Sequence, residues 1–91
     1  MKLTVTDAAL SRFIADWDFK NGDFIRIFVR YSGGGSDAFA FGIMKADHQR
    51  MSIHYEIGGI TFYMAENDTW YLDGKELIID SVNDEITFIR K

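Results

Sequence analysis

The chain has 91 residues, too few to divide between two cores, so we expect a single domain over residues 1–91. Hydrophobic residues make up 47% of it, which suffices for a packed core. Its 14 acidic residues outnumber its 10 basic ones and give a net charge of −4. Because nucleic acids and anionic membrane surfaces attract concentrated positive charge, the composition disfavours both kinds of partner.

The sequence contains no cysteine, which excludes disulfides, thiol nucleophiles and thiolate-bound metals or iron–sulfur clusters. No apolar run is long enough to span a membrane. The charged residues Asp7 and Arg12 stand where a signal peptide needs an apolar stretch, so we expect a cytoplasmic protein. A domain this small is only marginally stable, which favours self-association or another protein partner.

The predicted elements begin with a short strand over residues 2–5, followed by a helix with Thr6 as its N-cap. Asn21 and Gly22 provide the signal that ends this helix. Its apolar stripe follows the spacing i, i+3, i+4 and i+7 and consists of Leu10, Phe13, Ile14 and Trp17. We expect the stripe to pack against a sheet.

From residue 24 onward the apolar residues alternate, as in strands. Gly58 and Gly59 separate two alternating runs by two residues, which predicts a hairpin. Residues 66–72 are ambiguous and compatible with a helical turn. The strand candidates are residues 24–31, a run containing Phe39, Phe41 and Ile43, and residues 53–57, 60–64, 77–81 and 85–89, the last two joined through Asn83 and Asp84. The predicted fold class is mostly β with one N-terminal helix, α+β by composition.

A run of three glycines, Gly33, Gly34 and Gly35, lies between two of these strands and precedes Ser36 and Asp37. A phosphate-binding loop would continue into a helix, whereas here a strand pattern follows and Asp37 would repel phosphate. The remaining interpretations are a sharp turn, a close approach of the backbone to a bound group, or a site that has lost its ligand.

Four polar residues are candidates for a divalent metal site: Asp47, His48, His54 and Glu56. A solvated polar sheet face explains His54 and Glu56 more simply. Arg26 and Arg30 share one face of the second strand. We expect their heads to meet surface acids, with anion binding as the alternative. No catalytic constellation stands out, so an enzyme is not expected.

The order of these motifs resembles the HesB/IscA-like superfamily, the A-type iron–sulfur carriers. The resemblance begins with LTVTDAA at residues 3–9 and continues with IFVRYSGGGSDAF at residues 27–39. It closes with Gly59-Ile60, the YLDG turn at residues 71–74, then Leu77 and Phe88. The resemblance implies a compact, twisted mixed-sheet or barrel-like domain.

The departures from the family pattern bear on function. The first cluster-ligating cysteine of the family falls on Gly34, and the other two belong to a tail beyond Lys91. The resemblance therefore points to a cysteine-free, YneR-like branch without an iron–sulfur cofactor. It implies a non-enzymatic interaction or regulatory module associated with iron–sulfur cluster biogenesis. The alternative is a protein that binds a small ligand or a divalent metal near the glycine loop or His48 and His54.

Overall fold

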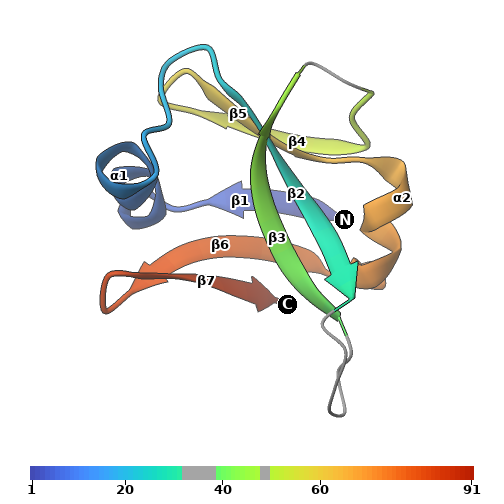
Figure 1. Ribbon diagram of the computed structural model, residues 1–91. Helices are drawn as coiled ribbons and strands as arrows, with labels where there is room; N and C mark the ends of the chain where they lie inside the picture. The colour runs from blue at the N-terminus through green and yellow to red at the C-terminus, as the bar shows by residue number, and fades with distance from the viewer. Residues whose placement is uncertain (32–38, 48–49) are drawn as a thin grey trace.

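The computed structural model describes residues 1–31, 39–47 and 50–91 (Figure 1). The elements in chain order are β1 (Lys2–Val5), α1 (Asp7–Asp16), β2 (Phe24–Tyr31), β3 (Phe39–Ala46), β4 (Ile53–Ile57), β5 (Ile60–Met64), α2 (Glu66–Thr69), a 3-10 turn (Trp70–Leu72), β6 (Glu76–Val82) and β7 (Glu85–Arg90). The predicted fold class is confirmed. The ambiguous stretch before β6 forms the short helix α2 and the turn that follows it.

The strands form two mixed sheets. In the three-stranded sheet, of order β1-β6-β7, β1 runs parallel to β6 and β7 antiparallel to it. In the four-stranded sheet, of order β3-β2-β5-β4, the central pair β2 and β5 is parallel. The sheets adjoin where β1 lies beside β4. At the ends of the two sheets opposite β1 and β4, the outermost strands are β3 and β7, and no described strand pairs with their outer edges.

Two tight turns have the same backbone form. Gly58 and Gly59 have φ values of +61° and +76° and join β4 to β5, with Ile57 opposite Ile60. Asn83 and Asp84, with φ values of 52° and 64°, join β6 to β7 in the same way. Two successive residues of positive φ match the right-handed twist of the flanking strands. The hairpin predicted at Gly58 and Gly59 and the predicted connection of two strands through Asn83 and Asp84 are both confirmed.

The helix begins where predicted and ends earlier. The hydroxyl of Thr6 accepts a hydrogen bond from the backbone N–H of Ala9, at 3.2 Å. The prediction that Asn21 and Gly22 end the helix is wrong, because α1 stops at Asp16 and Trp17 is its C-cap. Asp18 takes a left-handed conformation, φ 59°, which ends the helix and returns the chain toward the core at Phe19.

The predicted apolar stripe of α1 is only partly buried. Phe13 is fully buried, whereas Ile14 and Trp17 keep 51% and 41% of their surface exposed. Phe19 replaces them in the core, because its ring stacks on that of Phe13 with 5.3 Å between centroids. The expectation that the whole stripe packs against a sheet is therefore wrong for Ile14 and Trp17.

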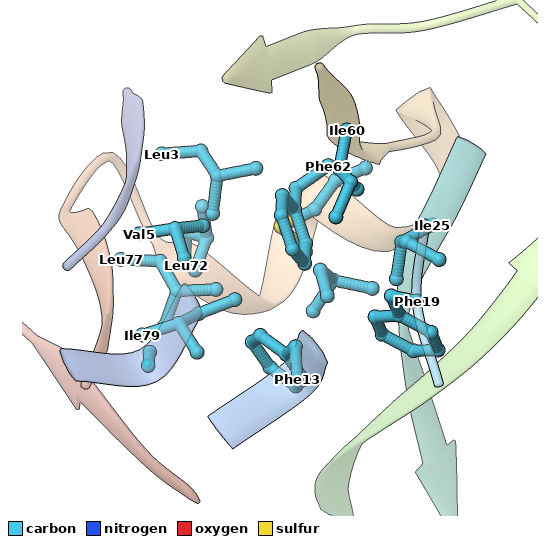
Figure 2. Packing of buried hydrophobic residues seen from close by; sticks show 13 residues of the cluster. Leu3, Val5, Phe13, Phe19, Ile25, Ile60, Phe62, Leu72, Leu77 and Ile79 are labelled. Atoms are coloured by element: carbon cyan, nitrogen blue, oxygen red, sulfur yellow. The ribbon is translucent and has the colours of Figure 1, made fainter. Parts of the chain in front are cut away.

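The core lies between the two sheets and is closed at one end by α1. Figure 2 shows side chains from β1, α1, β2, β5 and β6 pointing toward one another around Phe13 and Phe62, whose ring centroids are 5.2 Å apart. The buried cluster consists of Leu3, Val5, Ala9, Phe13, Phe19, Ile25, Ile27, Ile60, Phe62, Met64, Leu72, Leu77 and Ile79. Tyr63, on the opposite face of β5, is also fully buried, and this burial raises the pKa of its hydroxyl.

Candidate functional site

A groove of about 500 Å³ opens between β3 and β7, two outermost strands whose outer edges have no described strand partner. Phe41 and Phe88 stack across the two strands with ring centroids 5.1 Å apart. The residues that line the groove are Trp17, Phe28, Arg30, Phe41, Gly42, Ile43, Asp84, Glu85, Ile86 and Phe88. The groove is thus mainly apolar and aromatic, with a few charged groups, as ligand and peptide sites commonly are.

The backbone of β3 presents hydrogen-bonding groups to this groove. Val29 of β2 donates its N–H to Oδ1 of Asp68, at 3.2 Å, so its backbone groups point away from β3. Phe41 lies directly opposite Val29, so these two residues form a non-hydrogen-bonded pair of the antiparallel ladder. In such a pair the N–H and C=O groups of each residue point away from the other strand. The N–H and C=O of Phe41, and those of Ile43 two residues later, therefore face the open edge of β3.

The charges around the groove have both signs. The exposed Arg30 pairs across the sheet with Ala40, near the start of β3, and forms no ion pair with any described residue. Asp84 and Glu85 stand at the β6–β7 turn. The guanidinium of Arg12 lies 3.7 Å from the Asp84 carboxylate, whose side chain is 87% exposed, so this pair is weak. The groove therefore offers a cation that has no ion-pair partner among the described residues and two carboxylates, of which Asp84 is only weakly paired.

Next to the groove lies a cluster of aromatic rings, which we call the aromatic cluster. Its members are Tyr31, Phe39, Phe41, Trp70, Tyr71 and Phe88. Tyr31, Phe39 and Trp70 are 70%, 38% and 56% exposed, and the ring of Phe39 contacts both of the others. Phe41 and Phe88 belong to the cluster and to the groove, so the two form one continuous surface. Contiguous exposed aromatic surface marks binding sites in soluble proteins.

Arg26 and Arg30, which share a face of β2, have different environments. Nη2 of Arg26 lies 2.7 Å from Oδ2 of Asp68 in α2. Asp68 is only 5% exposed, so the expectation that the head of Arg26 meets a surface acid is wrong. The Asp68 carboxylate can be buried because it also accepts the Val29 N–H and so satisfies two donors of β2 at once. Arg26 thus fastens α2 to the sheet and is not available to a ligand.

The predicted metal ligands are only partly described. His54 and Glu56 both lie exposed on β4, as a polar sheet face requires, and the backbone oxygen of Asp47 accepts a hydrogen bond from Tyr63. Within residues 1–31, 39–47 and 50–91 the structure holds no group of three or more potential metal ligands. His48 and the glycine loop, from Gly33 to Asp37, lie outside the described residues. The metal site and the role of the loop stay predictions.

Sequence reasoning missed the groove and the aromatic cluster. Tyr31, Phe39 and Trp70 come from three separate segments, and each fits the apolar pattern of its own segment. Two features of the sequence could have indicated an aromatic surface. Aromatic residues make up 15% of the chain, and several of them lie at the ends of the predicted strands.

Comparison with known proteins places the fold and the motifs in a family. The sequence model described as iron–sulphur cluster biosynthesis matches residues 1–90. The chain belongs to this family. The HesB/IscA-like resemblance of its motifs is thereby confirmed. The chain itself contains no cysteine. The prediction of one domain over residues 1–91 is compatible with this match and stays a prediction.

Two curated relatives match over most of their length. One, from Bacillus subtilis (strain 168), is named pyruvate dehydrogenase inhibitor and is 34% identical over 86 residues, 92% of this chain and 90% of the relative. An uncharacterized protein of Staphylococcus saprophyticus is 31% identical, covering 94% of this chain and 92% of that one.

A solved structure has a similar fold. The crystal structure of IscA with a [2Fe-2S] cluster superposes with a TM-score of 0.60 over 98% of this chain and 83% of that chain, at 15% identity. This likeness concerns the fold alone. The thiolates that usually hold such a cluster are missing here, because the chain contains no cysteine. None of the helices described is both long and apolar enough to cross a membrane.

Proposed function

We propose that this protein is a non-catalytic regulator that binds a pyruvate dehydrogenase and lowers its activity. The observation that carries the proposal is the relationship to the Bacillus subtilis pyruvate dehydrogenase inhibitor, 34% identical over 92% of this chain. The match extends through 92% of the chain, so it includes most of the residues of the groove and of the aromatic cluster.

Two physical features support a regulator that acts by binding. The family fold persists without the cysteines that would carry an iron–sulfur cluster, so cluster transfer by thiolates is not the activity. The exposed rings of Tyr31, Phe39 and Trp70 provide the kind of aromatic anchors that dominate protein–protein interfaces. The link to the iron–sulfur cluster biosynthesis family then reflects common descent of the scaffold.

The test is an inhibition assay with purified components. Increasing amounts of the protein are added to pyruvate dehydrogenase complex from its own host and, in parallel, from Bacillus subtilis, and the rate of pyruvate oxidation is recorded. We expect a saturable loss of rate and co-migration of the protein with the complex on gel filtration. A host enzyme that keeps its full rate at saturating protein overturns the proposal.

A chelator and a histidine variant separate this function from metal binding. Because the described residues hold no group of three or more potential metal ligands, we expect protein that has been treated with EDTA, and then freed of it, to inhibit as before. His54→Ala, which removes an exposed candidate ligand on β4, should inhibit like the unmodified protein. Loss of inhibition in either experiment would support the divalent-metal alternative instead.

A further inference from the structure

The groove between β3 and β7 has the features of a site for an extended polypeptide segment. β3 and β7 are both outermost strands, so each has an edge without a described strand partner. A strand that adds to such an edge gains main-chain hydrogen bonds, and adjacent pockets select its alternate side chains. Here Phe41, Gly42 and Ile43 are consecutive lining residues. The groove therefore runs along the backbone of β3 rather than over one of its faces.

The backbone groups needed for strand addition are those that face outward. The positions of Phe41 and Ile43 opposite Val29 and Ile27 direct their N–H and C=O groups away from β2. Gly42, opposite Phe28, directs its own groups toward β2. The ring of Phe28 covers Gly42 so closely that a Cβ there would lie 2.3 Å from its Cζ. The Phe28 ring thus occupies the space that a side chain at position 42 would need, so glycine fits there, between Phe41 and Ile43.

The opposite wall selects the side chains of the segment. Ile86 and Phe88 of β7 are apolar and only partly buried, so they favour apolar side chains on the segment's inner face. The carboxylates of Asp84 and Glu85 favour a basic residue at the end near the β6–β7 turn. Arg30, near the start of β3, favours an acidic residue at the other end.

A second copy of this chain is a poorer occupant. Its own β3 is already paired with β2, and its β7 with β6, so either strand has only one edge to offer. A segment that is not part of any sheet can pair with β3 while its other edge faces β7. The occupant that suits the groove is thus an extended, unpaired segment of a different protein.

We propose that the groove binds an extended segment of the regulated enzyme by strand addition to β3, with Phe41 and Ile43 as the hydrogen-bonding residues. The segment has alternating apolar side chains, with a basic residue toward Asp84 and Glu85 and an acidic residue toward Arg30. The nature of the partner rests on the proposed function, whereas the chemistry of the segment rests on the groove itself.

The central experiment compares Ile43→Pro with Ile43→Ala. Both substitutions remove the isoleucine side chain, but only proline removes the N–H that faces the groove. Proline is tolerated at such outward-facing positions of edge strands, because no hydrogen bond within the sheet is lost. We expect Ile43→Pro to require about tenfold more protein than Ile43→Ala for half-inhibition of the host pyruvate dehydrogenase.

Amide hydrogen exchange of the unmodified protein tests the same contact without a substitution. Adding the enzyme should slow exchange at Phe41 and Ile43 at least about tenfold, because both N–H groups become hydrogen-bonded. The Gly42 amide points toward β2 and serves as the internal reference. Inhibition that leaves Phe41 and Ile43 exchanging as before, or equal inhibition by folded Ile43→Pro and Ile43→Ala, overturns strand addition and leaves the proposed function intact.

Synthetic peptides test the groove apart from the enzyme. The probes are acetyl-Glu-Val-Thr-Val-Thr-Val-Lys-amide and its reversed sequence, titrated while the amide shifts of β3 are followed by NMR. If the enzyme is not inhibited but a probe shifts Phe41 and Ile43, the proposed function fails and the groove assignment holds. If neither the enzyme nor a probe at millimolar concentration perturbs these amides, the assignment fails too. A third outcome concerns self-association. If the unmodified protein is a dimer, and Ile43→Pro makes it a monomer that inhibits as before, the edge of β3 binds a second copy of the chain instead.

Discussion

Asp80 shows how single side chains fasten the first strand and helix to the rest of the sheet. Its Oδ1 accepts hydrogen bonds from the hydroxyl of Thr6, at 2.7 Å, and from the backbone N–H of Ser81, at 2.8 Å. The first of these bonds, and then the second, lowers the pKa of the Asp80 carboxyl. Thr6 is at the same time the N-cap of α1, so one hydroxyl links β6 to the start of the helix.

Because the pKa of Asp80 is lowered in the folded protein, the free energy of unfolding should fall at acidic pH. A carboxyl whose folded pKa lies below its unfolded value contributes stability above the unfolded value, near pH 4, and loses it as the pH falls through the folded pKa. Asp80→Asn keeps an oxygen acceptor but removes the charge. We expect the variant to have a lower free energy of unfolding than the unmodified protein at pH 7, and the two to converge as the pH falls through the folded pKa of Asp80. Urea titrations at pH 7 and at a series of acidic pH values measure this, and a gap that stays constant contradicts it.

Gly42 and Phe28 form a second feature at the residue scale. A Cβ added at Gly42 would lie 2.3 to 2.8 Å from atoms of the Phe28 ring, which is too close for contact. We therefore expect Gly42→Ala to displace this ring and destabilise the protein by about 1–2 kcal/mol. In a Phe28→Ala background the same change should be neutral or stabilising by up to about 1 kcal/mol, since glycine is unfavourable inside a strand. A double-mutant cycle without coupling would show that the ring does not cover Gly42 in solution.

At the scale of elements, local patterns were sufficient to predict most strands, the hairpin at Gly58-Gly59 and the connection through Asn83 and Asp84. The paired positive-φ residues Gly58-Gly59 and Asn83-Asp84 are recognisable because few other residues adopt that backbone form. The end of α1 was not predictable in the same way. Nothing local shows that Asp18 turns the chain and that Phe19, rather than Ile14 or Trp17, enters the core. That choice depends on where Phe62 of a distant strand presents its ring.

The ion pair between β2 and α2 is the polar link between elements that we expect to matter most. Asp68→Asn leaves an acceptor for Val29 but removes the charge opposite Arg26, whose buried Nε has no hydrogen-bond partner among the described residues. We expect a loss of about 2–3 kcal/mol in the free energy of unfolding. The control is Asp16→Asn, which removes the exposed pair of Asp16 with Arg12 and should cost less than about 0.5 kcal/mol. Equal losses in the two variants would mean that the buried pair contributes no more than the exposed one.

At the scale of the whole molecule, the sheet order accounts for what the sequence did not reveal. The parallel pairs β1–β6 and β2–β5 join segments that are far apart in the chain, and no local pattern specifies such partners. They leave β3 and β7 as neighbouring outermost strands, and so create the groove. The candidates that sequence reasoning selected were polar side chains and a glycine loop, whereas the surface that stands out in the structure is aromatic.

The aromatic cluster leads to a prediction about the molecule as a binding partner. Trp70 is 56% exposed, so replacing it with alanine removes little buried surface and should lower the melting temperature by only a few degrees. An exposed ring that anchors an interface, however, contributes about 2 kcal/mol or more to binding. We therefore expect Trp70→Ala, and likewise Tyr31→Ala, to raise the concentration for half-inhibition of the host pyruvate dehydrogenase about thirtyfold. Ile14→Ala is the matched control, because Ile14 is similarly exposed, at 51%, but lies on α1 outside the cluster. If all three variants inhibit alike, the rings of the aromatic cluster are not the anchors, and the binding surface must lie elsewhere on the protein.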